Sequence, residues 1–417
     1  MSITVVQKPG DIQPAQSPIV FSVLESTQAY TASEFQYTAN LYVWTGTPSQ
    51  SGSYIYSARK YPNPSGSGIF DFSKMINSTL TTLTATNDSV IKYYKVEVGW
   101  QYATGSTYVS QPGGLTQITC SAGGVMFMAY DGYNLFPNQI NTTMSGSNTY
   151  FPFMTDMPSV TQSVLITDVT RIDNSLNQKR GVGFWYGISD QHPTYGNTVG
   201  TIVYSASYDN GSKINSVYTT IYADVTSSDM VYSFGTAPGD GIIPTTSGSG
   251  ALTNYQVKFI SGSITYGTLN YEVVCEQYYT PVRICWKNRF GQLDWLNFYK
   301  RHNNTFNTDQ RLYQPQLGTW ESQTLSYNQY QTAQQRYIVD ATEVLDVNTN
   351  WLSDGYNEIM KQLMVSDEIY WLYDQTSYLV KPLTIKTNSL QFKTGVNNKL
   401  IQYTLSFDIG QPYKLLL

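Results

Sequence analysis

Short stretches of alternating side chains, separated by clusters of turn-forming residues, run through most of this 417-residue sequence. Tyr37–Trp44 alternates small or aliphatic with polar or aromatic side chains, and Val90–Tyr102 is a longer stretch of similar character. A period of two is typical of a half-buried strand. The run 62–66, Pro-Asn-Pro-Ser-Gly, interrupts the pattern with residues that favour a turn. The sequence therefore predicts a mainly β protein.

Changes in residue pattern divide the chain into four expected segments. The first lacks periodicity and is expected to be an extended arm, disordered or laid onto a neighbouring subunit. The second predicts a β-sandwich with a short helix, and the third a second β-sandwich. The fourth predicts a C-terminal antiparallel sheet with one covering helix, so it is α+β locally. The segments are 1–16, 17–118, 119–280 and 281–417.

The third segment contains several short strand candidates separated by Gly, Asn and Ser clusters. Many short strands of this kind favour a sandwich or barrel over a parallel sheet. The candidates are Ser163–Val169, Val182–Ile188, Thr201–Tyr208, Val217–Val225, Tyr255–Ile260 and Leu269–Glu276.

The fourth segment begins with a predicted hairpin in which Gly291 takes a left-handed conformation. Residues 303–335, rich in Asn, Gln and Tyr, are expected to form an extended excursion. Arg336–Asn348 is a strand candidate. Asn350 is the expected N-cap of a helix. The apolar stripe of that helix comprises Leu352, Tyr356, Ile359, Met360, Leu363 and Met364.

Composition narrows the function classes. Charged residues make up 13% of the chain, aromatic residues 14%, and the net charge is −5. A coiled coil is rich in Ala, Glu, Lys, Leu and Arg, and a disordered tail has few aromatic residues and a high net charge, so this composition excludes both classes. A general nucleic-acid binder needs a basic surface, which the negative net charge does not provide. We expect no sequence-specific nucleic-acid partner. A surface rich in Tyr and uncharged polar groups suits permanent contacts, because little charge is desolvated on burial. Tyr and Thr are also favoured in β-strands. Their abundance can therefore reflect permanent contacts, strand formation or both.

No run of 18 apolar residues occurs, and the N-terminus lacks the basic and apolar regions of a signal peptide. We therefore expect no membrane segment and assembly in a cytoplasm.

The sequence contains few of the residue patterns that are typical of catalytic sites. His192 and His302 are the two histidines, and no G-x-S-x-G motif accompanies them. No Cys/His metal spacing, P-loop or dinucleotide fingerprint is present. We expect no catalytic residue, no cofactor, no metal and no enzymatic activity. Hydrolysis by two carboxylates remains an alternative, because 29 acidic residues are present.

Basic and aromatic residues are interleaved around the predicted hairpin near residue 290. They could face nucleic acid. Alternatively, the aromatic groups pack inward and the basic groups are solvated or meet acids of a neighbouring subunit, which the acidic net charge favours. The candidate inter-subunit contacts are Trp286, Arg289, Phe290, Trp295, Tyr313, Tyr327 and Tyr330.

Segments near both ends of the chain carry a family resemblance. They are Pro62–Ser73, Arg283–Asp294, Ile385–Ser389, Lys393-Thr394 and Lys399–Thr404. Together they resemble virion structural proteins of tailed bacteriophages. The resemblance implies a structural role in the particle without naming a position in it.

The sheet-plus-helix pattern of the last segment is also similar to units of tail-tube, distal-tail and baseplate-ring proteins. About 280 residues upstream, counted from the expected boundary, favour a ring or adaptor over a simple tube subunit. The expected function is a non-enzymatic structural subunit of the virion, in a tail, baseplate or neck ring, assembled in the host cytoplasm. Its partners would be copies of itself and other virion proteins. The alternative is a receptor- or glycan-binding surface protein with a host-surface glycan as partner.

Overall fold

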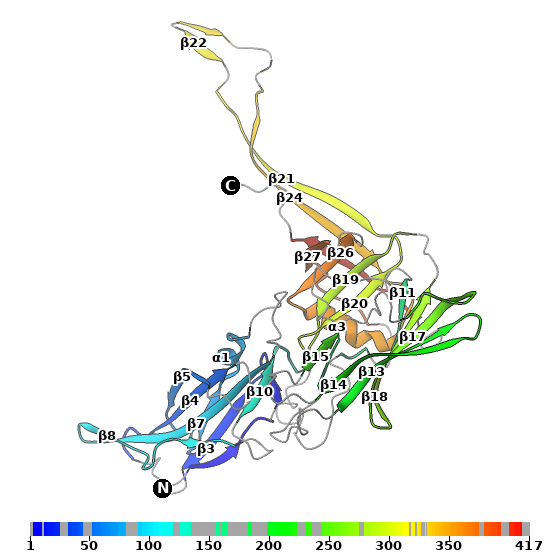
Figure 1. The fold of residues 1–417 in the computed structure, drawn as a ribbon. Helices are drawn as coiled ribbons and strands as arrows, with labels where there is room; N and C mark the ends of the chain where they lie inside the picture. Colours follow the sequence, from blue (N-terminus) through cyan, green and yellow to red (C-terminus); the bar gives the residue numbers. More distant parts are fainter. Residues whose placement is uncertain are drawn as a thin grey trace. The chain divides into compact units, whose positions relative to one another are not determined.

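Paired strands dominate the computed structural model, and helices are few and short (Figure 1). The fold is mainly β with several sheets, as the alternating pattern predicts. The structure describes residues 3–10, 12–25, 32–44, 52–80, 91–119, 126–134, 155–157, 160–165, 182–185, 198–222, 231–234, 243–274, 279–316, 318–321, 323–326, 330, 332–374, 379–392 and 400–410.

The N-terminal region contains two sheets. The smaller, antiparallel sheet has the order β1-β3-β6, with bounds Ile3–Gln7, Val20–Glu25 and Gly68–Asp71. The larger has the order β2-β10-β7-β4-β5, with bounds Ile12–Pro14, Phe127–Tyr130, Ile91–Thr104, Gln36–Trp44 and Ser53–Lys60. In addition, β8 (Thr107–Ser110) and β9 (Thr116–Gln117) pair with β7. Side chains of β4 alternate between buried and half-buried along the whole strand, which confirms the period of two.

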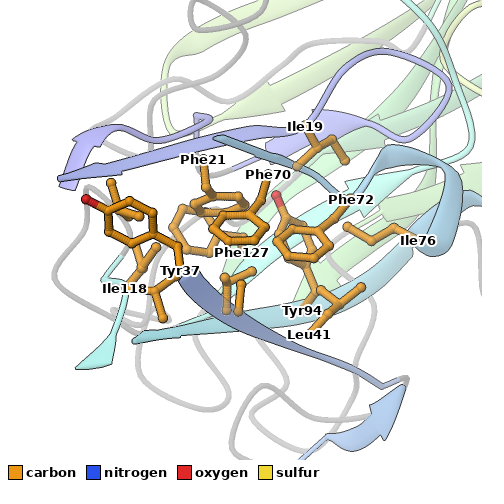
Figure 2. Close-up of a cluster of buried hydrophobic side chains, with 14 of the residues drawn as sticks. Ile19, Phe21, Tyr37, Leu41, Phe70, Phe72, Ile76, Tyr94, Ile118 and Phe127 are labelled. Atoms are coloured by element: carbon orange, nitrogen blue, oxygen red, sulfur yellow. The ribbon is translucent and has the colours of Figure 1, made fainter. Parts of the chain in front are cut away.

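Aromatic side chains from both N-terminal sheets form one core (Figure 2). Phe21 of the smaller sheet meets Phe127 of the larger edge to face, with ring centroids 5.4 Å apart. The short helix α1 (Ser73–Asn77) adds Ile76 to the same core. The hydroxyl of Tyr37 is satisfied inside it, because it accepts from Glu25 N at 3.0 Å and donates to Gly66 O at 2.7 Å. The two sheets therefore pack face to face as a sandwich.

The N-terminal arm and the expected boundary at residue 118 both differ from the structure. Residues 1–16 were expected to be an extended arm, disordered or laid onto a neighbouring subunit, but β1 pairs with β3 and β2 pairs with β10 of the same chain. The first sheet also continues past residue 118, because β10 pairs with β7 from Phe127↔Tyr94 to Tyr130↔Ile91. The extent of the first domain depends on backbone pairing between distant segments. Local turn signals in the sequence do not reveal that pairing.

A third sheet follows, with the order β11-β18-β17-β13-β14 and β16 paired to β17. Its strands are β11 (Thr161–Leu165), β18 (Ile264–Val274), β17 (Gly250–Ser261), β13 (Thr198–Tyr208), β14 (Lys213–Tyr222) and β16 (Thr246–Ser247). A ribbon pairs β12 (Val182–Trp185) with β15 (Val231–Phe234). Each strand candidate of this region overlaps one of these strands, which confirms the described part of each as β structure. The ends 166–169, 186–188, 223–225 and 275–276 lie outside the described residues.

The C-terminal sheet has seven strands in the order β20-β19-β26-β27-β29-β24-β21. Their bounds are Leu293–Phe298, Val282–Lys287, Ile369–Asp374, Leu379–Ile385, Thr404–Ile409, Gln335–Asn348 and Asn303–Tyr313. Two small ribbons pair β22 (Thr319–Glu321) with β23 (Thr324–Ser326) and β25 (Leu352–Ser353) with β28 (Leu400–Ile401).

The expected C-terminal helix begins later than its apolar stripe predicts. Leu352 pairs with Ile401 in the β25–β28 ribbon, so helix formation at Asn350 is displaced by strand pairing. A 3-10 turn (Asp354–Tyr356) follows, and α3 spans Asn357–Val365. The buried side of α3 still carries stripe residues, Ile359, Met360 and Leu363.

Contacts within the chain define two compact units that differ from the expected boundary at residue 281. One unit comprises Met1–Glu276, Trp286–Asp294 and Glu358–Ser366, and the other comprises Gln277–Cys285, Trp295–Asn357 and Asp367–Leu417. The turn between β19 and β20 groups with the first unit because it bonds to upstream residues. For example, Tyr133 N donates to Arg289 O at 3.0 Å.

Candidate functional site

The predicted excursion 303–335 contains the first strand of a long hairpin (Figure 1). β21 pairs with β24 from Asn303↔Asp346 to Tyr313↔Gln335. The C-terminal part of β24, Val344–Asn348, also pairs with β29. Among the described strands, the remainder of β24 pairs only with β21. The hairpin therefore leaves the sheet as a two-stranded ribbon, and Figure 1 shows it running away from β27.

The ribbon exposes its side chains to an unusual degree for a strand. All eleven residues of β21 are exposed. Apolar groups are among them, with Phe306 49% and Leu312 47% exposed. Tyr313 keeps 45% exposure although its hydroxyl donates to Gln335 Oε1 at 2.6 Å and its ring meets Tyr337 at 6.0 Å. This surface, which we call the hairpin surface, comprises residues 303–313, 335–337 and 341–343.

One described candidate, Tyr330, lies beyond β21 in the sequence, between β23 and β24. Tyr330 is 82% exposed, and Leu325 of β23 is 45% exposed. Tyr327 lies outside the described residues. The structure thus leaves Tyr313 and Tyr330 accessible for contact with another molecule.

The other candidate contacts are inside the fold. Trp286, Phe290 and Trp295 are buried, with exposures of 0%, 2% and 7%. The guanidinium of Arg283 lies 3.6 Å from the ring centroid of Trp295. The aromatic groups of this hairpin pack inward, and in this chain they are not available to a second subunit. The reason is that both β19 and β20 are buried along their whole length.

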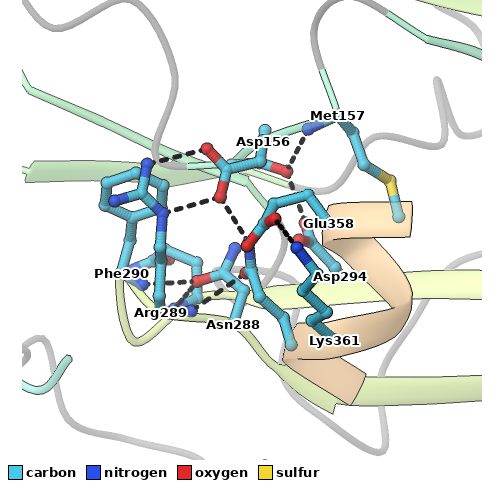
Figure 3. A network of polar contacts seen from close by, with 11 residues as sticks. Asp156, Met157, Asn288, Arg289, Phe290, Asp294, Glu358 and Lys361 are labelled. Carbon is cyan, nitrogen blue, oxygen red and sulfur yellow. Dashed lines mark hydrogen bonds and ion pairs between the residues drawn. The ribbon is translucent and has the colours of Figure 1, made fainter. Parts of the chain in front are cut away.

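Arg289 meets an acid of its own chain (Figure 3). Its Nε and Nη2 donate to the two carboxylate oxygens of Asp156 at 2.6 and 2.8 Å. Gln362 of α3 donates to the same carboxylate and accepts from Arg289 N at 3.2 Å. Burial lowers the pKa of Arg289, but the hydrogen bond and charge of Asp156 outweigh it and raise the pKa. The group ties residues 155–157, the turn and α3 together.

Asp294, which precedes Trp295 in the sequence, is a buried acid. Its carboxylate accepts from Thr155 Oγ1 at 2.7 Å. Burial raises the pKa of Asp294 to about 7; hydrogen bonds from Thr155 and Asn288 oppose the rise, and the charge of Asp156 adds to it. A carboxyl group of this kind titrates near neutral pH.

The turn that carries Arg289 is organised by Asn288 and Gly291. Asn288 Oδ1 accepts from Phe290 N at 2.9 Å and Gln292 N at 3.0 Å. Gly291 has φ +74°, which confirms the predicted left-handed position. A Cβ at Gly291 would lie 2.1 Å from Asp131 O, so only glycine fits this approach. Lys287 adds an ion pair to Asp131 at 3.2 Å.

The described residues contain neither a metal-binding cluster nor a membrane-spanning helix. No group of three or more His, Cys, Asp or Glu in that part of the chain could hold a metal ion. No helix there is long and apolar enough to span a membrane. His302 is half-buried, and His192 lies outside the described residues.

No family model matches this sequence, and no curated protein matches it. The fold and the exposed hairpin define a mainly β, multi-sheet protein with a projecting two-stranded element.

Proposed function

We propose that this chain is a non-enzymatic structural subunit of a tailed-phage virion, part of a tail, baseplate or neck ring. It works by assembly with copies of itself and with other virion proteins, and it is incorporated in the host cytoplasm. The proposal combines the family resemblance of residues 62–73, 283–294 and 385–404 with the surface of the chain.

The exposed two-stranded part of the hairpin is the observation that carries the assembly role. An isolated two-stranded ribbon is marginally stable in water, and an open edge strand invites pairing. Soluble monomers cover or charge such edges. Besides two charged residues, β21 presents the exposed apolar or aromatic side chains of Phe306, Leu312 and Tyr313. Contact with another subunit would cover them.

Uncharged side chains favour the same role. Of the eleven exposed residues of β21, six are uncharged and polar, and two, Asp309 and Arg311, are charged. Burying uncharged polar groups costs less than burying ions, provided that they find hydrogen-bond partners. Such a surface is suited to a permanent interface.

The test is the composition of purified particles. Mass spectrometry and immunogold labelling of virions from the phage that encodes the chain should detect it as a stoichiometric component. A shortened variant replaces residues 307–342 by an Asn-Gly turn between the cross-strand partners Phe306 and Glu343. It should fold, by circular dichroism, but fail to enter particles. Ile264→Ser, which changes an exposed apolar residue of β18, should enter normally. Absence of the native chain from virions would reject the proposal.

A surface pocket favours glycan binding as the second candidate function. The pocket has a volume of about 520 Å³, and Glu34, Tyr61 and Asn63 are among its lining residues. The Tyr61 side chain is 66% exposed. Asn63 Oδ1 accepts from Ser67 N at 2.8 Å, which orders the loop beside it. An exposed aromatic ring with polar neighbours suits stacking on a sugar.

A glycan array distinguishes this candidate from simple packing. Binding that Tyr61→Ala abolishes and Tyr54→Ala preserves would favour it, since Tyr54 is 56% exposed but lies outside the pocket lining. An array without signal would reject it and leave the assembly role in place.

A further inference from the structure

The outer edge of β21 is open in the described part of the chain. β21 ends the order of the seven-stranded sheet, and β24 is its one neighbour among the described strands. Every residue of β21 is exposed. Backbone N–H and C=O groups along such an edge can pair with an added strand.

A third strand would stabilise the hairpin. Between Phe306↔Glu343 and Tyr313↔Gln335, β21 and β24 pair only with each other among the described strands. Two-stranded ribbons need a third strand or a covering element for independent stability. The hairpin is therefore suited to completion by an extended segment from elsewhere.

The charged residues of β21 indicate which extended segment would pair with its open edge. Asp309 and Arg311 are two residues apart, so they point to the same face of the strand. Neither forms an ion pair or side-chain hydrogen bond with another residue that the structure describes. The register also places Asp309 on the same rung as Asp340, a second acidic residue. A partner strand that brings a positive charge opposite Asp309 and a negative charge opposite Arg311 would complement this edge.

We propose that β21 pairs antiparallel with β21 of a second copy of this chain, about a two-fold axis at Gln310. This inference rests on the proposed assembly role and names one of its contacts. In this register Asp309 lies opposite the partner's Arg311, and Arg311 lies opposite the partner's Asp309. Leu312 lies opposite the partner's Thr308, which covers part of its exposed side chain. The contact is isologous, so it joins copies in pairs.

Neighbouring registers are disfavoured by charge. A two-fold axis at Asp309 would place the Asp309 carboxylates of the two copies opposite each other. An axis at Arg311 would likewise place the two Arg311 guanidinium groups opposite each other. Like charges directly opposite each other destabilise an antiparallel pair. The sequence of β21 is therefore self-complementary in the register centred on Gln310.

Charge exchange tests the pairing. Sedimentation of the full chain measures self-association of the native protein, Asp309→Arg, Arg311→Asp and the double exchange. Each single variant should raise the dimer dissociation constant about tenfold, because both pairs become repulsive. The double exchange should restore the dimer dissociation constant of the native protein. A mixture of the two single variants should also associate, since one brings two positive and the other two negative charges. Equal association of all four proteins overturns the proposal, as does a native chain that stays monomeric.

Disulfide trapping tests the register. Residues directly opposite in an antiparallel pair have Cβ atoms about 4.5–5.5 Å apart, close to disulfide geometry. Gln310→Cys should give a covalent dimer on oxidation, above the background of the native chain. Thr308→Cys, on the same exposed face of β21, should not, because the two copies of residue 308 are four rungs apart. A dimer from Thr308→Cys but not from Gln310→Cys contradicts the register.

These outcomes separate the two proposals. If the charge variants have no effect and the chain is nevertheless found in purified virions, the pairing is wrong and the assembly role stands. If the chain is absent from virions but the charge exchange behaves as expected, the self-pairing stands and the virion role is wrong.

Discussion

Asp156 and Arg289 form a two-pronged ion pair across 133 residues of sequence, with contacts of 2.6 and 2.8 Å. Arg289 was a candidate for contact with another subunit, and it is instead occupied within its own chain. The planar guanidinium matches both carboxylate oxygens, an arrangement that fixes geometry as well as charge. The pair thereby holds the β19–β20 turn against residues 155–157.

Removing one member of this pair should destabilise the protein. Asp156→Asn leaves the half-buried Arg289 without its counter-charge, and we expect the free energy of unfolding to fall by about 2 kcal/mol in a urea titration. Lys361→Ala is the matched control, because it removes an exposed ion pair to Glu358 on α3. Its effect should stay within about 0.5 kcal/mol. Equal effects of the two variants would show that the Asp156–Arg289 pair has no special role.

Asp294 should make stability depend on pH. Its pKa is about 7 in the folded chain, above the ordinary value of 3.8 for an aspartate. Between these values the folded state binds more protons than the unfolded state, so stability is greatest below about pH 4 and falls as pH rises to about 7. The total loss is on the order of 4 kcal/mol.

Asp294→Asn removes the titrating group and keeps an oxygen that can accept from Thr155 Oγ1. Unfolding free energies measured from pH 4 to pH 8 should show a shallower fall for the variant than for the native chain. The variant should also be the more stable protein at pH 8. Parallel pH profiles for the two proteins would contradict the assignment.

Gly291→Ala should be far more damaging than Gly211→Ala. Both glycines have positive φ, +74° and +83°. A Cβ at Gly291 would lie 2.1 Å from Asp131 O, whereas at Gly211 nothing lies within 4 Å. We expect a loss of about 1 kcal/mol at Gly211 from the backbone conformation alone, and about 3 kcal/mol or more at Gly291. Thermal unfolding measures both, and similar losses would exclude the close approach.

Tyr37→Phe should weaken the N-terminal sandwich. The change removes the hydroxyl that accepts from Glu25 N and donates to Gly66 O in the core. Leaving such groups unpaired costs about 1–3 kcal/mol. Tyr61→Phe serves as the control, because Tyr61 is 66% exposed and lies outside the buried core. The prediction fails if calorimetry gives the two variants the same melting temperature.

The sequence pattern predicted those features that depend on residues close together in the chain, such as strand alternation and turn conformation. The alternation of Tyr37–Trp44 produced β4, and Arg336–Asn348 lies within β24. Gly291 takes its expected conformation because the turn chemistry lies within a few residues. Tyr313 and Tyr330 were selected from an Asn-, Gln- and Tyr-rich stretch, and both are exposed.

Features set by distant pairing were not predictable in the same way. Leu352 belongs to a helical stripe, yet its pairing with Ile401 makes it part of a strand. Trp286 and Phe290 were named as candidate contacts although inward packing was the alternative that the net charge favoured, and their burial in the sheet decides for inward packing. The link between Asp156 and Arg289 leaves no sequence signal, since nothing near residue 156 indicates a partner 133 positions away.

The most direct test of the assembly role is an electron cryomicroscopy reconstruction of purified virions from the encoding phage. We predict several copies of this chain in a tail, baseplate or neck ring, with residues 303–313 of each copy in contact with a neighbouring subunit. Particles that lack the chain, or that contain it with the β21–β24 hairpin surrounded by solvent, would contradict the account.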